Sequence, residues 1–132
     1  MSAQEKQDFW IRSSNIQNHV DHIAETLRNG MTFEDAGIDH EENGCELDDM
    51  ISGFDWLQDA LDMEFTVSSN GDFLGARILV AFGGPNIWVD TRWCKVDGFW
   101  WGDSASAEFV DSMDIHGACQ ELFECSRMFE CR

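Results

Sequence analysis

The sequence predicts an α+β fold with N-terminal helices, a four-stranded antiparallel meander sheet and a C-terminal helix packed on the sheet. Apolar residues recur at helical spacing up to residue 61, alternate with polar residues from residue 63, and return to helical spacing after residue 114. The chain has 132 residues, 43% of them hydrophobic. One domain over 1–132 is therefore expected, with an acidic helical part at 1–62, the antiparallel sheet at 63–112 and the C-terminal helix at 113–132.

Two helices are predicted before residue 38. The first has apolar residues at steps of four, three and four, namely Ile16, Val20, Ile23 and Leu27. Ser13 or Ser14 would provide its N-cap, and Asn29-Gly30 would end it. The second is a single turn, because Thr32-Phe-Glu-Asp35 has the form of a capping box. A polar loop is expected from 38 to 44.

A longer helix is predicted from about Glu46 to Leu61. Its apolar positions are Leu47, Met50, Ile51, Phe54, Leu57 and Leu61. The opposite side repeats at steps of four and three through Asp48, Ser52, Asp55, Asp59 and Asp62. On a helix these five positions lie within about 40° of one line, so four carboxylates would form a stripe about 21 Å long.

The remaining elements follow from period-two patterns and turn residues. Met63, Phe65 and Val67 indicate a strand, and Asn70-Gly71 predicts a type I′ hairpin turn. Three further strands, a second tight turn and a bulge complete the predicted sheet: Phe73 to Phe82, Ile87 to Trp93, the Asp97-Gly98 turn, and Phe99 to Val110 interrupted at Gly102-Asp103. The last helix begins at Asp114 and carries Ile115, Ala118, Leu122, Cys125 and Phe129 on its apolar face.

The charge is strongly negative and unevenly distributed. There are 26 Asp plus Glu against 8 Lys plus Arg, for a formal net charge of −18. No Lys or Arg occurs from Asn29 to Ala76, whereas that stretch contains thirteen carboxylates. Nucleic acid and anionic membranes would repel such a chain, so we expect it to bind basic protein surfaces and neither nucleic acid nor a membrane. The absence of a signal-like N-terminus favours a cytoplasmic protein.

We predict a partner-binding surface in this acidic half. Its residues are Glu34, Asp35, Asp39, Glu41, Glu42, Glu46, Asp48, Asp49, Asp55, Asp59 and Asp62. Ordinary solvated helix faces mix both signs of charge, and clustering without a base costs self-repulsion in the folded state. Solubility alone is the alternative explanation for these acids.

One block resembles a known group of proteins. Leu74-Gly-Ala-Arg-Ile-Leu-Val-Ala-Phe-Gly-Gly-Pro-Asn-Ile-Trp-Val-Asp-Thr-Arg92, with Gly98-Phe-Trp-Trp-Gly-Asp-Ser104, is similar to a block in small acidic proteins of phages and conjugative elements. The resemblance implies carriage on a mobile element and a cytosolic site of action. It implies no assigned activity, catalytic residue or cofactor. Size and acidity make the chain similar in kind to anti-CRISPR and anti-restriction inhibitors that imitate nucleic acid.

Other chemistries have weaker support. Trp88, Trp93, Trp100 and Trp101 alternate with Asp90, Asp97 and Asp103, as in a sugar-binding or glycosidase face, although strands use Trp for packing too. His19 with His22, and His116 with Cys119, have helical metal-ligand spacing but lack a second pair. Asp39 to Gly44 begins like a calcium loop whose twelfth position is Met50 instead of Glu. The five Cys are expected to be reduced thiols, those at 119 and 125 buried.

The resulting hypothesis is a non-enzymatic inhibitor without cofactor or metal. It would occupy the basic nucleic-acid-binding groove of a host complex, with a CRISPR effector the first choice and a restriction enzyme the second. The alternatives are a carbohydrate- or small-ligand-binding or hydrolytic domain using the Trp/Asp face, and a mobile-element assembly protein.

Overall fold

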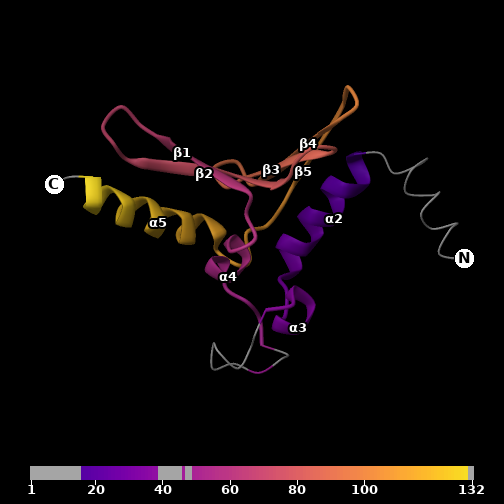
Figure 1. The fold of residues 1–132 in the computed structure, drawn as a ribbon, viewed down its shortest axis with the longest axis horizontal. Coiled ribbons are helices and arrows are strands. Elements are labelled where there is room, and N and C mark those ends of the chain that lie inside the picture. The colour runs from indigo at the N-terminus through magenta and orange to yellow at the C-terminus, as the bar shows by residue number, and fades with distance from the viewer. Residues whose placement is uncertain (1–15, 39–45, 47–48, 131–132) are drawn as a thin grey trace, which may run out of the picture.

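The computed structural model describes residues 16–38, 46 and 49–130. These residues form helices on one side of an antiparallel sheet (Figure 1). The elements in chain order are α2 (Ile16–Asn29), α3 (Phe33–Ala36), α4 (Gly53–Leu57), β1 (Asp62–Val67), β2 (Phe73–Ala81), β3 (Asn86–Asp90), β4 (Lys95–Trp100), β5 (Asp103–Glu108) and α5 (Ile115–Glu130). The predicted α+β class, the first helix, the one-turn helix and the C-terminal helix are confirmed.

The sheet has five strands in the order β1-β2-β3-β4-β5, each antiparallel to the next, so the predicted number of four is wrong. The predicted fourth strand is two strands. Trp101 and Gly102 form a two-residue turn between β4 and β5, with φ angles of 54° and 84°. Two positive φ angles in succession are typical of a type I′ turn, which takes the place of the predicted bulge.

The predicted Asp97-Gly98 turn is also wrong, because both residues pair inside β4. The turn lies earlier, at 91–94, and ends the third strand at Asp90. The Asp90 carboxylate accepts hydrogen bonds from the backbone N–H groups of Arg92 (2.9 Å) and Trp93 (3.2 Å). Such local bonding by Asp stabilises a turn and so competes with continuation of the strand.

The first hairpin is where the sequence predicts it, but the turn type differs. The N–H of Gly71 bonds to the Ser68 carbonyl at 2.9 Å, and Gly71 has a φ of 87°. The φ angle of Asn70 is not positive, whereas a type I′ turn requires positive φ at both central positions. The loop therefore uses a single left-handed glycine.

The predicted helix from 46 to 61 is reduced to the five residues of α4. The helix begins only after Ser52, because the Ser52 hydroxyl and the Asp55 carboxylate form a capping box there. Before the cap the chain is extended: Met50 bridges to Thr32, and the Ile51 N–H bonds to the Met31 carbonyl at 2.8 Å. Of the described members of the predicted acidic stripe, Asp55 lies on α4, whereas Asp59 and Asp62 lie beyond its end, so they do not form a stripe along one long helix.

The helices cover a single face of the sheet. In Figure 1, α2 lies under β4 and β5, α5 lies under β1 and β2, and α4 lies where the two long helices converge. One buried apolar cluster joins these elements, with Val20, Ile78, Val89, Val96 and Ile115 fully enclosed. No helix of the described part covers the opposite face of the sheet.

Glycine allows the close approach of α2 to β4. A Cβ added to Gly98 would lie 2.7 Å from side-chain carbons of both Ile16 and Val20. These two side chains are 2% and 0% exposed, so they have no open space to move into. Gly98 is therefore a packing residue of the helix–sheet interface.

Candidate protein-binding surface

The predicted acidic residues are distributed over several short elements. Glu34 and Asp35 lie on α3, Glu46 and Asp49 precede α4, Asp55 lies on α4, Asp59 lies in the turn after it, and Asp62 is the first residue of β1. Asp39, Glu41, Glu42 and Asp48 lie outside the described residues. The predicted set is therefore not one line of charge.

Three of these carboxylates also stabilise the local backbone. Asp55 Oδ2 accepts hydrogen bonds from the Ser52 N–H (2.9 Å) and hydroxyl (3.0 Å). Asp49 Oδ2 accepts from the Glu46 N–H at 2.8 Å, and Asp62 Oδ1 accepts from the Met63 N–H at 2.8 Å. Their spacing in the sequence thus partly reflects caps and turns.

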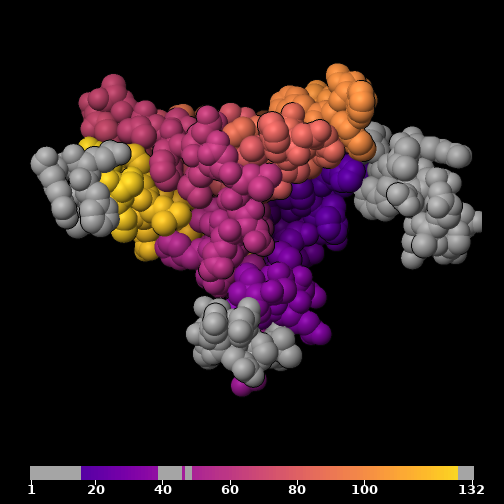
Figure 2. All heavy atoms as spheres, in the orientation of Figure 1, coloured from indigo at the N-terminus to yellow at the C-terminus, as the bar shows by residue number. Residues whose placement is uncertain are grey.

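The structure gathers a different set of acids around α2. One hollow beside the helix is lined by Asp21, Glu25 and Glu108, a second by Glu25 and Asp35, and a third by Asp55 and Asp59. The first two hollows share Glu25 and Asn29, and the last two share His22, Thr26 and Met31, so the three adjoin. We call Asp21, Glu25, Asp35, Asp55, Asp59 and Glu108 the α2 acidic band. Figure 2 shows the surface of α2 (indigo) between the sheet above and α3 (purple) below.

The band has little positive charge near it. Of the described Lys and Arg residues, Arg28 is the one that lines any of these three hollows. Within the described ranges the structure contains one ion pair, between Arg77 and Glu64 at 3.3 Å, and it lies on the sheet. Among the residues that the structure describes, no ion pair joins a carboxylate of the band to an arginine.

Three of the six residues of the band were not among the predicted site residues. Asp21 and Glu25 lie on α2 and Glu108 on β5, all outside the stretch that lacks Lys and Arg. The i, i+4 spacing of Asp21 and Glu25 on the polar side of an amphipathic helix was an available signal. Glu108 comes close to Asp21 and Glu25 because β5 packs against α2. No local sequence pattern predicts that packing.

The tryptophans do not form one platform. Arg77 lies over the ring of Trp88, 4.5 Å from its centroid, and Arg92 lies 4.7 Å from the centroid of Trp93. Trp100 packs edge-on against His19, whereas Trp101 is 90% exposed at the β4–β5 turn. Asp90 is engaged in its turn, and Asp97 and Asp103 lie on β4 and β5. One guanidinium group thus lies over each of the Trp88 and Trp93 rings.

His116 and Cys119, one of the pairs with metal-ligand spacing, are placed for packing. His116 Nδ1 lies 3.1 Å from the buried Thr91 hydroxyl, and Cys119 is fully buried on α5. Burial, with the Asp111 carboxylate adding to it, raises the pKa of the Cys119 thiol to about 12. Cys125 is exposed, so its predicted burial is wrong; the buried side of α5 passes through Phe123. In the part of the chain described, no three His, Cys, Asp or Glu are placed to share a metal ion.

Comparisons of the chain with protein-family models, curated proteins and solved structures give no match. Among the helices that the structure describes, none is long and apolar enough to cross a membrane.

Proposed function

We propose that this protein is a non-enzymatic inhibitor whose α2 acidic band occupies a basic nucleic-acid-binding groove of a partner protein. The observation that carries the proposal is the band itself: six carboxylates around one helix, with Arg28 as the one basic residue beside them in the part of the chain that the structure describes. A formal net charge of −18 supports it, because this charge attracts a cationic groove from a distance.

The proposed mechanism is competition with phosphate. Arg and Lys side chains that hold a nucleic-acid backbone form charge-assisted hydrogen bonds to carboxylates equally well. Long-range attraction sets mainly the association rate, whereas desolvated contacts set the lifetime of the complex. Exposed apolar side chains near the band, such as Met50 and Phe54, would supply part of the contact that salt does not screen.

The class of partner follows from the resemblance and the charge. We propose a bacterial defence complex that handles nucleic acid, with a CRISPR effector as first choice and a restriction enzyme as second. The inhibitor would be encoded by a phage or conjugative element and act in the bacterial cytoplasm. The band requires no cofactor for this role.

The test is affinity capture from a nuclease-treated bacterial lysate at two salt concentrations. Nucleic-acid-binding proteins should be retained at about 50 mM salt and largely released at about 500 mM, because the Debye length falls from about 14 to 4 Å. The band variant Asp21→Asn/Glu25→Gln/Asp35→Asn/Asp59→Asn should lose them.

The matched control removes the same number of charges elsewhere on the molecule. It combines Asp72→Asn, Asp97→Asn, Asp103→Asn and Glu121→Gln, and it should retain the captured proteins. Equal loss in both variants would mean that net charge acts without a defined surface. Retention by the band variant would refute the proposal.

A further inference from the structure

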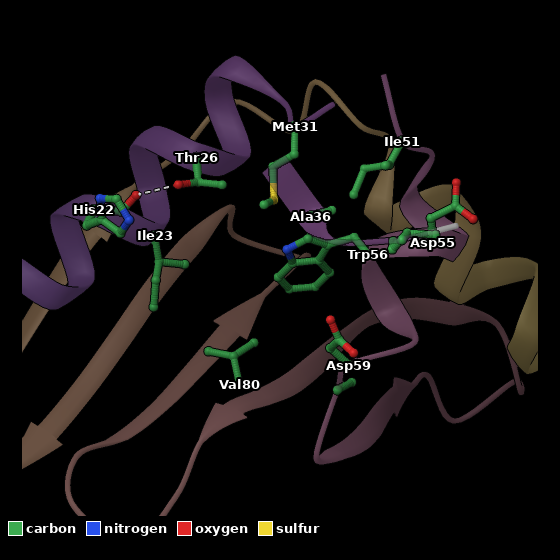
Figure 3. Close-up of a pocket in the computed structure, with 12 residues that line it drawn as sticks. His22, Ile23, Thr26, Met31, Ala36, Ile51, Asp55, Trp56, Asp59 and Val80 are labelled. Carbon is green, nitrogen blue, oxygen red and sulfur yellow. Dashed lines mark hydrogen bonds between the residues drawn. The ribbon is translucent and has the colours of Figure 1, made fainter. Parts of the chain in front are cut away.

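A pocket opens at one end of the α2 acidic band, between α2, α3 and α4 (Figure 3). Its volume is about 320 Å³. Figure 3 shows the Trp56 indole in the middle of the pocket, with Met31 and Ala36 on one side and Val80 and Asp59 on the other. Ligand pockets typically measure about 300–1,000 Å³, so this one suits a single side chain or a similarly small molecule.

The lining combines apolar walls, an aromatic ring and negative charge. Ile23, Met31, Ile51 and Val80 contribute the walls, and Trp56 contributes an indole ring. Among the described residues that line the pocket, Asp55 and Asp59 are the two carboxylates, and there is neither Lys nor Arg. An anionic ligand would meet repulsion here, and a purely apolar ligand would leave the carboxylates without a counter-charge.

Asp59 is available for a ligand. In the part of the chain that the structure describes, no hydrogen bond or ion pair engages the Asp59 carboxylate, which is exposed at the pocket rim. Asp55 uses Oδ2 for the capping box of α4, which fixes that carboxylate in place. One carboxylate is thus held rigidly and the other is unpaired.

We infer that this pocket binds the arginine side chain of a protein partner. The aliphatic stem of arginine fits apolar walls, its planar guanidinium stacks on an indole, and its N–H groups match a carboxylate. Stacking of a guanidinium on an indole occurs twice within this molecule. The guanidinium carbons of Arg77 and Arg92 lie 4.5 and 4.7 Å from the ring centroids of Trp88 and Trp93. The inference deepens the proposed function and rests on it, because an arginine of the basic groove would be the occupant.

The first test uses the isolated protein and a defined probe. N-acetyl-arginine amide should shift the Trp56 indole N–H resonance, assigned with Trp56→Phe, with a millimolar dissociation constant. N-acetyl-citrulline amide has nearly the same shape without the charge and should shift this resonance at least tenfold less at equal concentration. Equal shifts from both probes, or no shift from the arginine probe, would overturn the inference.

Two substitutions distinguish a local contact with the Asp59 carboxylate from attraction by the negative charge of the whole molecule. Asp59→Asn should weaken arginine binding at least fivefold, because it removes the unpaired carboxylate without changing size. Asp103→Asn, the matched control, removes the same charge at the first residue of β5, outside the band, and should change binding less than twofold. Equal weakening by both would refute a specific pocket.

The final arm distinguishes a partner's arginine from a free small cation. Asp59→Asn should also lower capture of the partner more than Asp103→Asn does. If arginine amide binds but capture is equally affected by both variants, the occupant is a free cation and the assignment to a partner is wrong. If capture depends on the band but arginine amide does not bind, the pocket inference fails and the proposed function stands.

Discussion

Replacement of Gly98 by alanine tests the packing of α2 on the sheet. A Cβ at this position would lie 2.7 Å from Ile16 Cγ1, 2.7 Å from Val20 Cγ2 and 2.8 Å from Ile16 Cδ1. Carbon atoms that are not bonded prefer separations of about 3.5–4.0 Å, so the helix must move or the side chains must leave their rotamers.

The expected destabilisation is moderate. An extra methyl group in a tightly packed core costs about 1–3 kcal/mol. Alanine in place of glycine recovers about 0.5–1 kcal/mol of backbone entropy in a strand. Gly98→Ala should therefore lower the free energy of unfolding by about 1–2 kcal/mol, which corresponds to a fall of about 0.5–1 M in the urea midpoint at an m-value near 2 kcal/mol/M.

The assay is urea unfolding followed by far-UV circular dichroism, with Asp97→Asn as control. Asp97 precedes Gly98 on the same strand and faces away from α2, so Asp97→Asn should stay within about 0.5 kcal/mol of the parent. If Gly98→Ala is as stable as the parent, or if Asp97→Asn is the more damaging change, the close approach of α2 to β4 is incorrect.

Three further predictions concern stability. Trp101→Asn should raise the free energy of unfolding by about 1 kcal/mol in urea titrations, because Trp101 is 90% exposed and left-handed, and Asn-Gly favours a type I′ turn; a loss would contradict this turn. Asp111→Ala should cost about 1–2 kcal/mol in the same assay, because the Asp111 carboxylate accepts from the N–H groups of Ile115 and His116 at the start of α5. Above about pH 9, Cys119 ionises in the unfolded chain, whereas the folded thiol, with its pKa raised to about 12, stays neutral. The free energy of unfolding should therefore fall by up to about 1.4 kcal/mol per pH unit. A Cys119→Ala variant whose free energy of unfolding falls with the same slope would refute this.

Elements with a strong local signal were predictable. The first helix follows from Ile16, Val20 and Leu27, all of them buried as the periodicity requires. The one-turn helix follows from Thr32, whose hydroxyl accepts the Asp35 N–H at 3.1 Å. In both cases neighbouring residues in the sequence supply the stabilising contacts.

The errors arose where a local signal was ambiguous or tertiary contacts decided the outcome. Ser52 fits an exposed helix face, but it also fits an N-cap, and pairing of Met50 with Thr32 favours the cap. Asp97-Gly98 is a strong turn dipeptide, yet Gly98 is needed inside β4, because a larger residue would clash with α2. The acidic band depends on contacts between α2, α3, α4 and β5, so its membership could be seen only in three dimensions.

The most direct test of the central claim is displacement of nucleic acid from the captured partner. Labelled DNA or RNA bound to that partner should be released as this protein is added, with a fall in fluorescence polarisation. The four-substitution band variant should release at least tenfold less at equal concentration. A ternary complex, in which polarisation rises while the nucleic acid stays bound, would contradict occupation of the nucleic-acid groove.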